Sequence, residues 1–413
     1  MRPALRSWLC SATIGTALLL ACGVNDSSAA ELWRLAGPAV AARLVAADAA
    51  GATFAWQGTE AAVPWAELVR WGSPAELADP TSADPTNPAV SGRDPEWLLR
   101  PAGVIYAHLE SSEEDRFGLS SASFFSIDLR RDDLRGVIFA AGLSPAQRAA
   151  LQAWADEARD RDRLRLQNGD ELSGQLEHLG EQDLSFQGER GTFETPLERV
   201  TAVALAATGA PPASGKLWVG LADGSRLLVS ALKIEDEQAE LELPSGERWQ
   251  TQRALIVFLQ PRQSRADFLS DLEPESYRQL PFLGAPWPHY GRNKNVTGGP
   301  LRSREQLHLS GLGVHGAAQL TYRLEKPYRR FAALAAIDRA AGSKGSAVFR
   351  VFVDPGDGKW VERFASDVVR GGQPPIPIDV DIAGAKRLRL VVDYADRGDE
   401  LDYADWLEAR AVP

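Results

Sequence analysis

Residues 311–322, "GLGVHGAAQLTY", decide how the last third of this chain is interpreted. Glycines flank a single histidine, His315, and the segment continues directly into a strand-like run. A histidine in such a position can be a catalyst, a metal ligand, a sugar contact or a structural residue. Which of these it is bears directly on what the protein does.

The region around this stretch reads as an all-β sandwich. From about Phe282 onward, strands of four to seven residues alternate with Gly, Asp and Pro breaks. Asp357-Gly358 predicts a hairpin that joins residues 348–353 to residues 360–364. Residues 387–392, "RLRLVV", indicate a buried central strand.

Five short motifs occur along this region: Gly311-Leu312-Gly313-Val314-His315, Tyr328-Arg329-Arg330-Phe331, Ile337-Asp338, Gly345-Ser346-Ala347-Val348-Phe349 and Ala404-Asp405-Trp406. Together they resemble the NPCBM domain, a carbohydrate-binding module, over roughly residues 281–412. The resemblance implies a jelly-roll or galactose-binding-like β-sandwich, usually an accessory to glycosidases, with members that bind galactose-type sugars. The final motif departs from the family, because Tyr403 stands where members often have histidine.

Two roles stay open for His315. A catalytic role needs a partner acid or nucleophile, and none occurs at a recognisable spacing. A metal site with His308 does not match a standard ligand pattern. In the structural alternative, the glycines allow a sharp turn and His315 hydrogen-bonds a buried backbone group or Asp405. In the functional alternative, its imidazole donates to a sugar hydroxyl.

The other candidate sugar contacts are an aromatic platform and two acids. Trp406 or Tyr403 would stack on the apolar face of a pyranose, with Asp405 and Asp338 as polar contacts; turn-stabilising roles are the alternative for both acids. An exposed aromatic beside polar groups would favour sugar binding, and full burial of Trp406 and His315 would favour a structural protein. No cofactor is expected, although Asp393, Asp396, Asp399 and Asp402 could hold a structural calcium instead of forming a solvated loop.

Upstream, the chain repeats one pattern of short strands and Gly turns. The copies span residues 31–72, 97–141, 163–207 and 215–260, and the last two contain the hairpin signals Asn168-Gly169 and Asp223-Gly224. We expect about four small SH3-like β-barrel units, packed in pairs because each is close to the lower size limit for a core. They resemble units in large secreted proteins of planctomycete-type bacteria. Residues 73–96 read as a Pro-rich linker and residues 144–162 as a linker helix capped by Ser144, while the sandwich is expected at 281–413.

The first thirty residues have the layout of a secretory signal. Residues 19–22, "LLAC", resemble a lipobox with Cys22 as the lipidated residue, whereas residues 28–30, "SAA", read as an ordinary signal-peptidase site. Cys10 and Cys22 are the only cysteines, so the mature chain has no disulfide and no thiol nucleophile. We expect an exported protein at the periplasm, cell surface or beyond, without a transmembrane span in its mature form.

The composition and net charge of the chain disfavour some classes of binding partner. The 413-residue chain has a net charge of −11, which disfavours nucleic acid and anionic membranes. No pair of carboxylates upstream resembles a glycosidase site. The preferred hypothesis is therefore a non-enzymatic glycan-binding protein that recognises cell-surface polysaccharide. The alternatives are an envelope scaffold that binds other proteins and, third, a hydrolase with an unrecognised site.

Overall fold

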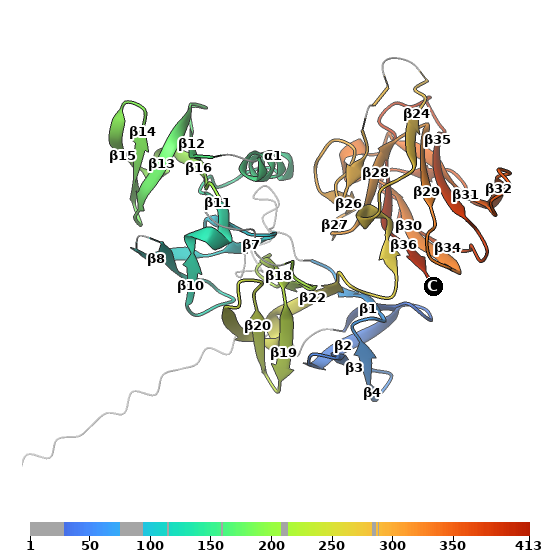
Figure 1. Ribbon diagram of the computed structural model, residues 1–413, viewed down its shortest axis with the longest axis horizontal. Helices are drawn as coiled ribbons and strands as arrows, with labels where there is room; N and C mark the ends of the chain where they lie inside the picture. Colours follow the sequence, from blue (N-terminus) through green and yellow to red (C-terminus); the bar gives the residue numbers. More distant parts are fainter. Residues whose placement is uncertain are drawn as a thin grey trace, which may run out of the picture.

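The computed structural model describes residues 29–74, 94–113, 115–157, 160–207, 214–282, 286–287 and 289–413. Residues 1–28 of the predicted signal, which include Cys22, and most of the 73–96 linker lie outside these residues. Strands dominate the described chain, with α1 (Pro145–Asp156) as its one α-helix. Figure 1 shows several small strand groups, in blue to yellow, beside a larger orange and red sandwich.

Four groups of strands, units 1 to 4, precede the sandwich. Unit 1 contains β1 (Ala30–Arg34), β2 (Val40–Ala47), β3 (Gly51–Trp56), β4 (Thr59–Pro64) and β5 (Leu68–Gly72). Unit 2 contains β6 (Glu96–Leu99), β7 (Gly103–Tyr106), β8 (His108–Glu113), β9 (Arg116–Ser120), β10 (Ile127–Arg130) and β11 (Leu134–Ile138). Unit 3 contains β12 (Asp162–Leu166), β13 (Glu171–Leu179), β14 (Asp183–Gly188), β15 (Gly191–Pro196) and β16 (Val200–Ala204). Unit 4 contains β17 (Leu217–Leu221), β18 (Arg226–Val229), β19 (Ala231–Glu235), β20 (Gln238–Glu242), β21 (Arg248–Gln252) and β22 (Ile256–Pro261).

The units share one pairing order. In each unit the first strand pairs with both the second and the last, as in β1–β2 with β1–β5 and β12–β13 with β12–β16. Units 2 and 4 repeat this order through β6 and β17. A 3-10 turn precedes the last strand in units 2, 3 and 4: η1 (Arg131–Asp133), η2 (Leu197–Arg199) and η3 (Arg253–Leu255). The predicted turns at Gly169 and Gly224 are present, and both glycines have positive φ, 92° and 88°.

The units join through their last strands. β5 pairs with β22, which couples unit 1 to unit 4, and β11 pairs with β16, which couples unit 2 to unit 3. A glycine lies in each junction, because a Cβ on Gly72 or Gly136 would overlap a carbonyl oxygen of the facing strand. Pairing of β7 with β18 then joins units 2 and 4. The four units therefore form one continuous hydrogen-bonded assembly.

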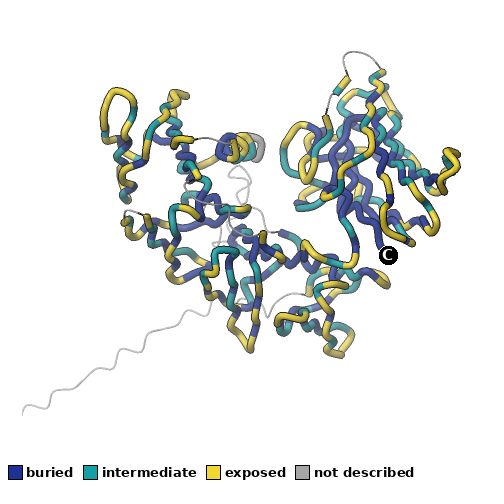
Figure 2. The backbone as a smooth tube through the Cα atoms, in the orientation of Figure 1, coloured by how far each residue is buried: buried dark blue, intermediate teal, exposed yellow. Residues whose placement is uncertain are grey.

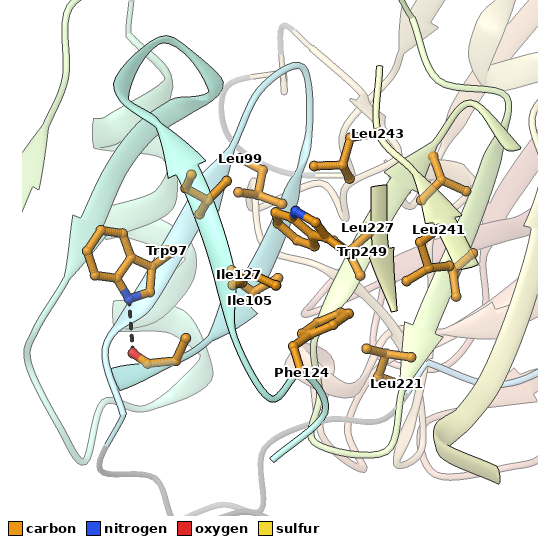
Figure 3. Close-up of a cluster of buried hydrophobic side chains, with 14 of the residues drawn as sticks. Trp97, Leu99, Ile105, Phe124, Ile127, Leu221, Leu227, Leu241, Leu243 and Trp249 are labelled. Carbon is orange, nitrogen blue, oxygen red and sulfur yellow. Dashed lines mark hydrogen bonds between the residues drawn. The ribbon is translucent and has the colours of Figure 1, made fainter. Parts of the chain in front are cut away.

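Units 2 and 4 also share a hydrophobic core (Figure 3). Phe124 of unit 2 lies edge-on to Trp249 of unit 4, with ring centroids 5.3 Å apart. The hydroxyl of Thr251 donates to the Ser123 carbonyl at 2.7 Å beside this contact. Burial of these large rings stabilises the contact by several kcal/mol, at about 25 cal/mol per Å² of apolar surface.

Helix α1 covers the outer face of the junction between units 2 and 3. Ser144 forms a capping box with Gln147, and the helix packs on a separate apolar cluster that includes Trp154, Ile138 and Ala202. The helix is shorter than the predicted 144–162. It ends at Asp156, and β12 begins at Asp162, whose carboxylate accepts hydrogen bonds from the backbone of Leu176 and Ala206.

The C-terminal sandwich consists of two main sheets. One has the order β25 (Gly291–Arg292), β28 (Gly311–His315), β36 (Tyr403–Val412), β30 (Arg330–Ile337) and β34 (Ile376–Asp381), with β23 (Asp267–Phe268) paired to β36. The other has the order β24 (Ser276–Gln279), β29 (Ala318–Arg323), β35 (Arg387–Tyr394), β31 (Ser346–Asp354) and β32 (Val361–Ala365), with β33 (Val369–Arg370) paired to β31. A hairpin, β26 (Leu301–Ser303) with β27 (Gln306–His308), and the turns η4 (Leu269–Asp271) and η5 (Arg339–Ala341) complete it.

Three sequence expectations can be compared with this sandwich. The hairpin at Asp357-Gly358 is confirmed as β31–β32, and residues 387–392 form the centre of β35, between β29 and β31. The sandwich begins before residue 281, because β23 and β24 already pair with its strands. The buried strands of the sandwich appear in dark blue in Figure 2.

Unit 1 packs directly on the sandwich. Trp33, Leu35 and Val69 form an apolar cluster with Phe268 and Val412. Next to it, the Arg70 Nε lies 2.7 Å from Glu408 Oε1, and both side chains are almost completely buried. His308 lies 3.2 Å from the same carboxylate. Among the described residues, we find no helix with the length and apolarity to cross a membrane.

Candidate functional site

The glycines around His315 allow close backbone packing. Residues 311–315 form strand β28 itself, which pairs with β36 on one side and β25 on the other. These residues therefore form a strand where the sequence suggested a sharp turn. A Cβ on Gly313 would overlap the backbone of Asn295, and one on Gly316 would lie 2.8 Å from the Cβ of Asp402. The motif therefore lets two neighbouring segments lie directly on the strand.

His315 lies at the end of β28 within a group of rings. The ring of Trp287 stacks on the imidazole at 5.1 Å with an interplanar angle of 18°. Tyr403, the cross-strand partner of His315, meets the imidazole edge-on at 5.7 Å and Trp287 at 6.0 Å. His289 is exposed and lies 6.1 Å from Trp287. We call Trp287, His289, His315 and Tyr403 the ring site.

Hydrogen bonds to β24 fix the position of Trp287. The Gln279 amide accepts from the Trp287 backbone at 3.0 Å and donates to the Gly316 carbonyl at 3.0 Å. The Tyr277 hydroxyl donates to the Trp287 carbonyl at 3.3 Å. Because Gln279 is itself buried, its bonds hold the Trp287 backbone in place without lying on the surface.

A second aromatic pair lies close to the ring site. Phe282 and Tyr394 are both exposed, with exposed fractions of 56% and 45%, and their ring centroids are 5.5 Å apart. Asp399 accepts a hydrogen bond from the Phe282 backbone at 2.9 Å and also acts electrostatically on His315. Exposed aromatic side chains gathered next to carboxylate and imidazole groups are typical of ligand surfaces rather than of cores.

Burial controls protonation around the ring site. It lowers the pKa of His315, although the Gly316 backbone and Asp399 oppose this, so the imidazole is neutral at pH 7. The His315 Nδ1 atom is buried and has no hydrogen-bond partner among the described residues. Burial also raises the pKa of Asp402 to about 7. The negative charges of Asp399 and Asp396 raise this pKa further, whereas a hydrogen bond from the Ser346 backbone lowers it.

The structure places Trp406 in the core. Its exposed fraction is 1%, and its ring packs edge-on between Phe331 and Phe349. The ring therefore has no free face on which a sugar could stack, whereas the ring of Trp287 beside His315 is partly exposed. His315 is also buried, with 7% exposed. The burial of Trp406 and His315 meets the criterion for a structural protein. The exposed aromatic side chains beside polar groups meet the criterion for sugar binding.

Asp338 and Asp405 lie away from the rings and hold a loop in place. Asp338 accepts hydrogen bonds from the Asn295 amide and from the backbone of Ala340 and Arg302. Asp405 is completely buried next to it, and burial together with Asp338 raises the pKa of Asp405 well above its usual value. Protonation of Asp405 would avoid burying two neighbouring carboxylate charges.

The four aspartates of the acidic run have separate surroundings. Asp393 pairs with Arg350 and Asp396 with Arg370, while Asp399 and Asp402 accept backbone hydrogen bonds. Over the ranges that the structure describes, no three His, Cys, Asp or Glu side chains form a group able to hold a metal ion.

Sequence reasoning did not find Trp287, His289 or Gln279. A signal was present, because residues 286–290, "PWPHY", place two rings and an imidazole in a proline-rich segment immediately before the β25 strand. Prolines disfavour a buried strand at that position, so its aromatic side chains are candidates for a surface role.

Comparison with known proteins now identifies the class of this domain. Residues 265–412 match the family model of the NPCBM/NEW2 domain. The match falls on the same C-terminal region as the five motifs, so this region resembles the NPCBM/NEW2 domain, carried on a longer chain. A protein of Renibacterium salmoninarum named "Putative endo-alpha-N-acetylgalactosaminidase" is 26% identical over 176 residues, which cover 40% of this chain and 11% of that protein.

Several solved structures with some similarity to this chain contain carbohydrate-binding modules. A CBM51 from Clostridium perfringens GH95 in complex with methyl-galactose is 23% identical, with a TM-score of 0.31, over 36% of this chain and 99% of that one. The CBM51-2 and INT domains of Clostridium perfringens ZmpB give 23% identity and a TM-score of 0.31, over 49% and 38% of the two chains. This chain thus spans only a minor part of the curated relative and of the ZmpB structure.

Proposed function

We propose that this protein is an exported, non-catalytic glycan-binding protein whose NPCBM domain holds a galactose-type sugar at the ring site. The observation that carries the proposal is the partly exposed ring of Trp287, stacked on His315 and flanked by Tyr403. A pyranose with an axial hydroxyl group has one apolar face, which suits an aromatic ring, and polar edges, which suit imidazole and phenol groups. Galactose has this shape.

The roles of the residues follow from their exposure. Trp287 is the platform, and His289 and the Tyr403 hydroxyl contact sugar hydroxyl groups. His315 is a positioning residue that supports the platform from below, since it is buried and stacked on it. The exposed pair Phe282 and Tyr394 extends the surface along which a longer glycan would lie.

The proposed absence of catalysis rests on the role of the module family, which is to bind. Hydrolysis of a glycoside requires two carboxylates placed across the scissile bond. At the ring site, Asp402 is buried and Asp399 is engaged with the Phe282 backbone. Turnover of chromogenic galactosides or N-acetylgalactosaminides above the blank would contradict this part of the proposal.

Calorimetric titration of the full chain tests the binding. The probes are methyl galactoside, N-acetylgalactosamine and, as a comparison, methyl glucoside. We expect saturable binding of at least one galactose-type probe and its loss in Trp287→Ala. Trp360→Ala is the matched control, because Trp360 lies under Arg389 on the other sheet of the sandwich, away from the ring site. No binding of either galactose-type probe, or equal loss in both variants, would overturn the proposal.

A scaffold without sugar affinity is the second candidate, and the burial of His315 and Trp406 favours it. In that case "GLGVH" only packs the strand, and the four joined units present surfaces to other envelope proteins. The same titration separates the two functions, since the scaffold predicts no heat with any sugar. Mass spectrometry of the processed N-terminus would distinguish cleavage before Cys22 with lipidation from cleavage after Ala30.

A further inference from the structure

A cavity lies between the sandwich and the units, away from the ring site. Its volume is about 390 Å³, within the range of small-ligand sites, which is about 300–1,000 Å³. Unit 4 contributes Trp218, Arg226 and Arg262, and the sandwich contributes Lys294, His308 and Ser310. Helix α1 and unit 2 form its remaining wall. Ligand sites occur preferentially at such boundaries between domains.

Positive charge gathers in this cavity although the chain as a whole is acidic. Arg226, Arg262 and Lys294 line it, and none of them forms an ion pair with a described residue. Arg135 also lines it but is paired with Asp156, which leaves Asp271 as the uncompensated acid. Three free cations against one free carboxylate favour an anionic ligand, because low-dielectric walls strengthen the local field.

The cavity also has the features of a carbohydrate site. Trp218 is partly exposed and lies directly opposite Gln260 in the β17–β22 pairing. Gln260 is 2% exposed, and its Oε1 atom has no hydrogen-bond partner among the described residues. The His308 Nε2 atom is likewise buried without a described partner, while its Nδ1 faces Glu408. These buried polar atoms leave hydrogen-bonding capacity beside the cavity that the hydroxyl groups of an occupant could use.

We infer that this cavity binds an anionic glycan segment, with Trp218 under a sugar ring and Arg226, Arg262 and Lys294 around its acidic groups. Carboxylate and sulfate groups would both fit this chemistry. The site is separate from the ring site, and the inference stands or falls independently of the galactose proposal. Together, the two sites would let one molecule hold a neutral side branch and an acidic backbone of a surface polysaccharide.

Calorimetry on the full chain with three hexasaccharides tests the inference: hexagalacturonate, a chondroitin sulfate hexasaccharide and a neutral galactan hexasaccharide. We expect one or both anionic probes to bind, and to bind more weakly at high salt. Trp218→Ala should lower the affinity by at least about tenfold, and Arg262→Gln by several-fold with a smaller salt dependence. Arg262 is exposed, so its substitution does not threaten the fold.

Two controls keep the outcomes distinct. Arg323→Gln removes another exposed arginine, on the second sheet of the sandwich, and should leave the affinity unchanged. Trp287→Ala at the ring site should also leave binding of the anionic probes unchanged. No binding of either anionic probe would overturn the inference, as would Arg262→Gln binding with wild-type affinity. Stronger binding of the neutral hexasaccharide than of both anionic ones would equally overturn it.

Discussion

Glu408→Gln tests whether the buried ion pair fixes unit 1 to the sandwich. Arg70 and Glu408 have side-chain exposures of 4% and 3%, and the substitution keeps the volume while it removes the charge. Removal of one partner from a buried pair costs about 3–5 kcal/mol, because the other charge stays buried. Arg70 keeps the Gly72 carbonyl at 2.5 Å and Glu31 at 3.3 Å. We therefore expect the lower end, about 3 kcal/mol.

A solvent-exposed ion pair across the same boundary between unit 1 and the sandwich provides a matched control. Glu67 and Arg265 are 3.9 Å apart and more than half exposed, so Glu67→Gln should cost at most about 1 kcal/mol. Hydrogen exchange measured by mass spectrometry reports the opening free energy of β5 and β36 separately from the rest of the chain. Equal protection of β5 and β36 in the two variants would refute the reasoning.

The pH dependence of this pair has a definite sign. Burial opposes ionisation of Glu408, but Arg70 and His308 outweigh it and lower the pKa from 4.5 to about 2. A carboxylate with a depressed pKa stabilises the folded state above its unfolded pKa and loses that contribution as pH falls. The stability difference between wild type and Glu408→Gln should therefore shrink between about pH 4.5 and pH 2.

Two further substitutions probe the ring site and its strand. Because the folded-state pKa of Asp402 is raised, the wild type should lose up to about 4 kcal/mol of stability as pH rises from 3.8 to about 7, and Asp402→Asn should abolish this loss. Melting temperatures across this pH range check the prediction. Parallel curves for the two proteins would contradict it. Gly313→Ala should destabilise the sandwich by about 1–3 kcal/mol, since its Cβ would overlap the Asn295 backbone. Gly188→Ala, where the nearest atom lies 3.8 Å away, is the control, and an equal fall in melting temperature for both would argue against the steric reason.

Local features of this fold could be predicted from the sequence. Asn168-Gly169, Asp223-Gly224 and Asp357-Gly358 act within a few residues, so their hairpins follow from turn chemistry alone. The burial of β5 could not be predicted in the same way. Arg70 in "LVRWG" indicates an exposed edge, yet the whole strand is buried because its counterion, Glu408, comes from a distant part of the chain.

The same difficulty explains why the burial of Trp406 could not be predicted. In β36 nine consecutive residues are buried, since one face lies on the core and the other is covered by unit 1 and the β26–β27 hairpin. The two faces of a strand are told apart by the alternation of buried and exposed residues, and β36 lacks that alternation. The sequence therefore could not show that Trp406 is a core residue. Trp287 lies in an irregular segment whose position depends on Gln279 and Tyr277, and no periodic pattern reports such contacts.

The order in which the units join has a consequence for biosynthesis. The pairing of unit 2 with unit 3 is nested inside the pairing of unit 1 with unit 4. As the chain emerges, β5 remains an open edge until β22 has been made, whereas β11 meets its partner much sooner. Maturation should thus proceed from the inner pair outward, and a chain cut before unit 4 would expose β5 as a template for association with other copies.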